Sequence, residues 1–125
     1  MTLTEVALTQ CWTTFPDRQR LPLPSQSGFF DVTKRDSNTM DVTTAGDNSI
    51  KVPRAAFVGA LDYLIKEGHV EGNPCEVRNK YDNPGPLAQA AAVNGTQTIQ
   101  YVLPILQAMG LVAVNSNKPN TTWLV

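Results

Sequence analysis

The chain is poor in the side chains that most often bind metals or carry nucleophilic catalysis. Its 125 residues include one histidine, His69, and two cysteines, Cys11 and Cys75. A zinc site needs a set of Cys and His ligands, and these residues are too few to supply one. Only His69 could be the base beside a catalytic nucleophile, and no Walker A, Rossmann or GxSxG pattern occurs. The sequence therefore predicts a protein that is not an enzyme and that holds no cofactor and no metal ion.

The chain also lacks membrane signals and a strong net charge. No apolar run is long enough to cross a bilayer, and MTLTEVALTQ has no basic n-region of a signal peptide. We therefore expect a cytoplasmic protein in which Cys11 and Cys75 are free, with a disulfide between them as the alternative. The formal net charge of −1 argues against strong non-specific binding to nucleic acid, which depends on many Lys and Arg contacts with phosphate.

The last third of the chain has no acidic residue at all. From Asn83 to Val125, Lys118 is the only charged side chain. The polar positions are Asn, Gln and Thr instead. Asn and Gln can bond adenine in the major groove, and Thr can donate to phosphate, so such a surface is compatible with DNA. The alternative is a neutral polar surface without a ligand.

The same third has the periodicity of two helices followed by a hairpin. Residues 86–93 are helix-compatible, and Asn94-Gly95 is a strong turn signal. Thr96 or Thr98 can then cap a longer helix over residues 96–109, which Gly110 closes. The apolar residues of this longer helix recur at spacings of three and four: Ile99, Val102, Leu103, Leu106 and Met109. Its opposite side holds Gln97, Gln100, Tyr101, Pro104 and Ala108, so Pro104 is expected to face outward. Residues 111–115 and 121–125 read as strands joined by the turn 116–120.

This segment resembles the winged helix-turn-helix superfamily. The resemblance lies in the helix ending ILQAMGLV, the short polar turn after it, and the strand at TTWLV. It implies a three-helix core with a β-hairpin wing over residues 111–125. It also implies that helix 96–109 enters the major groove and that the turn 116–120 contacts the DNA backbone or the minor groove.

The first half of the chain predicts a helix and a β-meander. Thr2 and Glu5 form a capping-box pattern for a helix over residues 3–14, in which an exposed Trp12 would mark a dimerisation surface. Residues 16–28 carry three prolines and read as a loop, where Arg18 and Arg20 are a solvated connector or a basic arm. Residues 29–52 alternate as a three-stranded antiparallel meander with Phe30, Val32, Met40, Val42, Ile50 and Val52 on matching faces.

The charged residues of the meander have two interpretations. Its aspartates, Asp31, Asp36, Asp41 and Asp47, fit solvated strand and turn positions better than a metal site. Its basic residues either balance these aspartates or form an edge that faces phosphate; they are Lys34, Arg35, Lys51 and Arg54. A helix follows over residues 53–67, and residues 69–85 read as a turn-rich link in which His69 is structural or solvated.

Together these patterns predict one α+β domain, residues 1–125. Residues 1–52 would hold the N-terminal helix and the meander, and residues 53–125 the winged helix-turn-helix. The function hypothesis is a double-stranded DNA-binding protein, such as a transcriptional regulator, that forms a homodimer through its N-terminal helix. The residues expected to contact DNA are Arg54, Arg78, Lys80, Asn94, Thr96, Gln97, Thr98, Gln100, Tyr101, Lys118 and Asn120. The alternative is a protein-interaction module in which Tyr101, Pro104 and Ala108 form an apolar docking patch.

Overall fold

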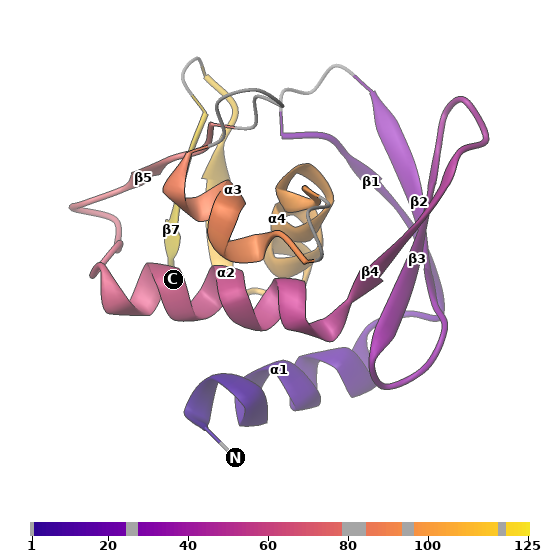
Figure 1. Cartoon of the computed structure of the whole chain (residues 1–125), viewed down its shortest axis with the longest axis horizontal. Helices are drawn as coiled ribbons and strands as arrows, with labels where there is room; N and C mark the ends of the chain where they lie inside the picture. The colour runs from indigo at the N-terminus through magenta and orange to yellow at the C-terminus, as the bar shows by residue number, and fades with distance from the viewer. Residues whose placement is uncertain (1, 25–27, 79–84, 94–96, 118–119) are drawn as a thin grey trace.

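The computed structural model describes residues 2–24, 28–78, 85–93, 97–117 and 120–125 (Figure 1). Lys80, Asn94, Thr96 and Lys118, which the sequence analysis assigned to DNA contact, lie outside these ranges. The described helices are α1 (Leu3–Thr14), α2 (Arg54–Lys66), α3 (Pro86–Ala91) and α4 (Ile99–Ala108). The described strands are β1 (Arg18–Pro22), β2 (Phe29–Lys34), β3 (Thr39–Thr44), β4 (Ser49–Pro53), β5 (Cys75–Glu76), β6 (Val112–Asn115) and β7 (Thr121–Leu124).

The first sheet is an antiparallel meander of four strands in the order β1-β2-β3-β4. The predicted alternation is correct, because Phe30, Val32, Met40, Val42 and Val52 are buried on its inner face. The prediction of three strands is wrong, because residues 18–22 pair with β2 instead of forming a loop. This strand is difficult to recognise in the sequence because it contains Arg18, Arg20 and Pro22. A strand at a sheet edge can tolerate proline and charge.

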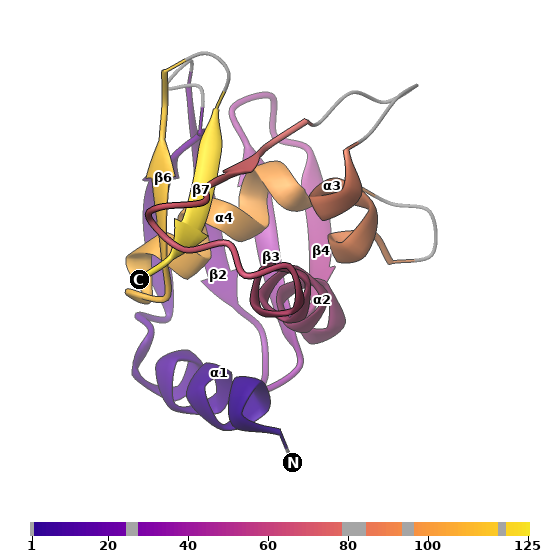
Figure 2. The same ribbon diagram turned by 90° about the vertical axis from the view of Figure 1, so that its left-hand side faces the viewer.

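The second sheet joins β5, β7 and β6 in that order, and α4 lies between the two sheets. Figure 2 shows the hairpin β6–β7 in front, the meander behind it and α4 enclosed between them. The expected hairpin of β6 and β7 is present, but β7 also pairs with β5 on the edge away from β6. The winged helix-turn-helix prediction is therefore wrong: its reading helix would have to be exposed, whereas this one is the centre of the core. Only the α+β class is confirmed.

Helix α4 is buried around most of its circumference. The buried residues are Ile99, Tyr101, Val102, Leu103, Pro104, Ile105 and Leu106. The expectation that Pro104 faces outward is wrong, because α4 packs against α2 and α3 as well as against β1 and β6. A helix that is apolar on all sides belongs in a core and not on a surface.

Helices α2 and α3 approach each other closely through small side chains. A Cβ atom on Gly59 of α2 would overlap the carbonyl oxygen of Ala90 in α3. Ala56 and Ala60 of α2 and Ala91 of α3 are completely buried nearby. The close approach of α3 to another helix is thus made chiefly with α2.

Helix α1 covers one end of this assembly (Figure 1). The predicted capping box is present, with Thr2 and Glu5 each accepting from the other's backbone N–H. Trp12 is only 3% exposed and meets Phe57 edge to face at 5.2 Å between ring centroids. The expectation of an exposed Trp12 is therefore wrong, because this ring fills the contact between α1 and α2.

Candidate ligand-binding cavity

A cavity of about 660 Å³ opens where the ends of the meander strands meet α4 and the segment after β5. Sites for small molecules span roughly 300–1,000 Å³ and are mostly apolar with a few placed polar groups. This cavity fits both descriptions. Its lining residues are Leu23, Pro24, Gly28, Phe29, Phe30, Thr44, Ala45, Gly46, Glu76, Val77, Arg78, Gln100, Tyr101 and Asn120.

An aromatic pair forms part of the cavity wall. The rings of Phe30 and Tyr101 meet edge to face, with centroids 5.2 Å apart and an interplanar angle of 76°. Phe30 is held on β2 between Leu21 of β1 and Thr44 of β3 by the register of the sheet. Tyr101 lies in the first turn of α4, where its N–H donates to the carbonyl of Thr98 at 2.9 Å. Two regular elements therefore fix the wall before any ligand binds.

The Tyr101 side chain brings one polar group into this apolar wall. The residue is only 7% exposed. Within the described part of the chain, its hydroxyl makes no hydrogen bond, and it is not among the fully enclosed polar atoms. Tyr101 itself lines the cavity. Buried Tyr hydroxyls usually find a partner, so this one is available to a ligand.

Hydrogen bonds from distant segments hold the rim together. The Asn120 side-chain amide donates to the Pro24 carbonyl at 3.4 Å, and the Asn120 carbonyl accepts from the Val77 N–H at 2.8 Å. The Leu23 N–H donates to the Gly28 carbonyl at 2.9 Å across the connection between β1 and β2. Asn120 thus joins both sheets at the cavity mouth.

Two opposite charges stand on one side of the segment that leaves β5. Glu76 and Arg78 are exposed and line the cavity, whereas Val77 between them is half-buried. Gly85 supports Arg78 by donating its N–H to the Arg78 carbonyl at 2.9 Å. Among the described residues no ion pair engages either side chain. The described part of the rim therefore carries one positive and one negative group.

Cys75 lies beside this rim but does not have the properties of a nucleophile. Both cysteines are free, as expected, and Cys75 is buried. Burial raises the pKa of the Cys75 thiol, and the nearby Glu76 carboxylate raises it further. Reactive cysteines have lowered pKa values, so this thiol is a packing residue of β5.

The cavity brings together four of the residues that the sequence analysis assigned to DNA contact: Arg78, Gln100, Tyr101 and Asn120. Gln97 is half-buried and Thr98 is buried, with a hydroxyl that has no partner among the described residues. The suggestion that Thr98 caps α4 with its side chain is wrong, although Thr98 does occupy the cap position. Sequence reasoning missed Leu23, Phe29 and Phe30. Strand alternation could have indicated Phe29, because it places this aromatic ring on the sheet face opposite to that of the inward-facing Phe30. In the structure Phe29 is 60% exposed.

Arg54 has a structural role away from the cavity. Its guanidinium donates to the carbonyls of Glu5 at 3.1 Å and Ser37 at 3.2 Å, and also to the Thr9 hydroxyl. It lies 5.6 Å from the centroid of the Trp12 ring, within cation–π range. These contacts tie the start of α2 to α1.

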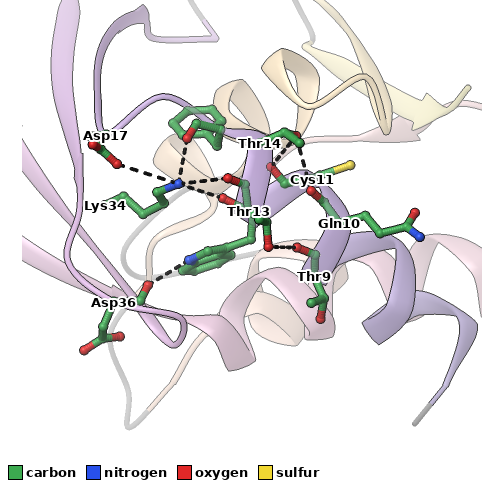
Figure 3. A network of polar contacts seen from close by, with 10 residues as sticks. Thr9, Gln10, Cys11, Thr13, Thr14, Asp17, Lys34 and Asp36 are labelled. Atoms are coloured by element: carbon green, nitrogen blue, oxygen red, sulfur yellow. Dashed lines mark hydrogen bonds and ion pairs between the residues drawn. The ribbon is translucent and has the colours of Figure 1, made fainter.

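Lys34 makes a second structural network at the end of α1 (Figure 3). Its ammonium donates to the carbonyls of Trp12 at 3.1 Å, Thr13 at 3.3 Å and Phe15 at 2.7 Å. Nearby, the Trp12 indole N–H donates to the carbonyl of Asp36 at 2.8 Å. The network joins α1 to the meander, and the Lys34 ammonium is engaged by backbone carbonyls of the same protein.

The other basic residues of the meander are partly neutralised by its aspartates. Arg20 pairs with Asp31 and Arg35 with Asp41, each at 3.1 Å. The hydrogen bond from Arg20 lowers the pKa of Asp31. This pairing agrees with the interpretation that basic and acidic side chains balance each other on the sheet surface.

Three further observations concern metal sites, membrane-spanning helices and His69. Across the described ranges, no three His, Cys, Asp or Glu side chains gather where they could hold a metal ion. The helices in those ranges are all too short or too polar to cross a membrane. His69 contacts the carbonyl of Asn73 through Nδ1 at 2.8 Å and stacks on Tyr63.

Comparison with protein-family models, with curated proteins and with solved structures finds no match for this chain.

Proposed function

We propose that this protein is a binding protein and that its site is the cavity between the strand ends and α4. The observation that carries the proposal is the cavity itself: about 660 Å³, with an aromatic wall and a small set of polar groups. In a protein without other marks of function, such a pocket is the best-founded binding site. The ligand class that fits it is a small, largely apolar organic molecule bound without covalent chemistry.

The two functions predicted from the sequence have less support in the geometry. Reading duplex DNA with α4 would need Thr98 and Tyr101 at the surface, and both are buried. The proposed protein-docking patch loses Tyr101 and Pro104 to the core for the same reason. DNA binding, protein docking, a homodimer through α1 and a cytoplasmic location stay predictions from the sequence.

The test is a titration with toluene followed by two-dimensional amide NMR. Toluene is a compact apolar ring, and we expect its shift changes to cluster at the backbone amides of Phe30, Thr44, Val77 and Tyr101. A Gly28→Phe variant should abolish these changes by filling the cavity. A side chain is tolerable there, because the one described atom that a Cβ on Gly28 would meet is Leu23 Cδ1 at 3.7 Å, an ordinary contact.

Gly72→Phe is the matched control, since a Cβ on Gly72 would have no described atom within 4 Å and Gly72 does not line the cavity. It should bind toluene as the parent protein does. Shift changes scattered over the surface, or equal binding by the Gly28→Phe variant, would refute the cavity as the binding site.

A further inference from the structure

The Tyr101 hydroxyl is a polar group in the otherwise apolar wall that Phe30 and Tyr101 form. It is the polar end of a residue that lines the cavity and is more than nine-tenths buried, and it has no hydrogen-bond partner in the described chain. A ligand that only fills the space would cover this hydroxyl and leave it unpaired, which is unfavourable. A ligand with a hydrogen-bonding group at that point would satisfy it.

The surroundings of the hydroxyl determine the rest of the ligand. Phe30 and Tyr101 are already edge to face, and Leu23 and Val77 add apolar surface, so the wall suits another flat ring. The rim holds Glu76 and Arg78, which both line the cavity. Among the described lining residues these two opposite charges balance, so they favour neither an anion nor a cation.

We infer that the ligand is a neutral aromatic ring bearing one hydrogen-bonding substituent, which the Tyr101 hydroxyl recognises. This inference rests on the proposed function. This chemistry is found in free phenols and in tyrosine side chains of polypeptides. The carbonyl, hydroxyl or ring nitrogen of such a molecule can accept from Tyr101, and a hydroxyl can also donate to it.

The experiment compares three para-substituted toluenes by NMR titration: p-cresol, toluene and p-toluate. One neutral hydrogen bond corresponds to about a three- to tenfold difference in Kd, so p-cresol should bind tighter than toluene by that factor. The anion p-toluate should bind no tighter than p-cresol. In a Glu76→Gln variant, where Arg78 is left as the only charged residue of the described lining, p-toluate should gain relative to p-cresol.

Tyr101→Phe is the decisive variant. It keeps the ring beside Phe30 and removes a hydroxyl that makes no hydrogen bond in the described chain, so the thermal midpoint should stay unchanged. The preference for p-cresol over toluene should disappear, while toluene still binds. Tyr63→Phe, a tyrosine outside the cavity lining, is the matched control and should keep the preference.

The outcomes separate this inference from the proposed function. If toluene and p-cresol bind the parent protein equally at the cavity, or if Tyr101→Phe keeps the preference, the role of Tyr101 is wrong and the binding site stands. Tighter binding of p-toluate than of p-cresol would overturn the neutral ligand. If neither ring binds at the cavity, the proposed function itself fails. N-acetyl-tyrosinamide identifies the source of the ring: tighter binding than p-cresol indicates a polypeptide, and equal or weaker binding indicates a free phenol.

Discussion

Replacing Lys34 with methionine should destabilise the protein far more than the loss of an ordinary surface lysine. Methionine keeps an unbranched apolar side chain but removes the ammonium that donates to Trp12, Thr13 and Phe15. The lysine side chain is only 17% exposed, so solvent cannot easily replace it at the part-buried carbonyls of Trp12 and Phe15. The variant therefore leaves the C-terminal end of α1 with unsatisfied acceptors.

The size of the effect follows from the bonds. A hydrogen bond to a charged group contributes about 1.5–3 kcal/mol, and a cation at a helix C-terminus adds about 0.3–1 kcal/mol. Because the three bonds share one ammonium and are not additive, we expect a total loss of about 2–4 kcal/mol of unfolding free energy. For a chain of this size, each kcal/mol shifts Tm by roughly 3–5 °C, so Tm should fall by roughly 6–20 °C.

Urea unfolding and thermal unfolding, both followed by far-UV circular dichroism, measure this loss. Lys51→Met is the matched control, because Lys51 is exposed on β4. This replacement should change the unfolding free energy by less than about 0.5 kcal/mol. Asp17→Asn tests the ion pair separately. Asp17 Oδ1 lies 3.8 Å from the Lys34 ammonium and the Asp17 side chain is 97% exposed, so its loss should be small. Equal losses for Lys34→Met and Lys51→Met, or a full loss from Asp17→Asn, would refute this reasoning.

Two further predictions concern packing and pH. Gly59→Ala should destabilise by about 2 kcal/mol or more, because the new methyl group would force α2 away from the Ala90 carbonyl, and urea unfolding would show this loss. Burial raises the pKa of Cys75 in the folded state, so its contribution to stability is complete below the unfolded thiol pKa and is lost as pH rises toward the folded one. Urea unfolding above about pH 8.5, the usual thiol pKa, should therefore show falling stability, and Cys75→Ala should remove that part of the slope. An unchanged slope in this variant would contradict the assignment.

Local patterns predicted most of the secondary structure correctly. The capping box of Thr2 and Glu5 set the start of α1, and strand alternation gave the inner face of β2 and β3. Strand β1 was missed because its charged residues and Pro22 are typical of a loop as well as of an edge strand. The pairing that identifies it, Arg20 opposite Asp31, is a contact with β2 and cannot be read from β1 alone.

The arrangement of α4 was harder to predict for a different reason. A single apolar stripe could be drawn on residues 96–109, and Tyr101 and Pro104 were placed opposite to it. In the structure both are buried, and the Tyr101 ring packs against Phe30 of the meander. Tyr101 was selected for contact with DNA bases and instead lines a cavity. The cavity itself depends on strand ends, α4 and Asn120 meeting in space, and no spacing in the sequence encodes that meeting.

The central position of α4 has a consequence for the order in which the chain can fold. During synthesis, residues 1–76 emerge first and can form α1, the meander and α2, but the inner face of the meander then has no α4 to cover it. That face holds Phe30, Met40 and Val42, which are fully or almost fully buried in the finished protein. The meander ends at Pro53 and α4 ends at Ala108. Because chains grow at roughly 5–20 residues per second, these side chains wait roughly 3–11 seconds for α4. The nascent chain is thus exposed to aggregation until its last quarter arrives, and a chain ending before residue 99 stays in that state permanently.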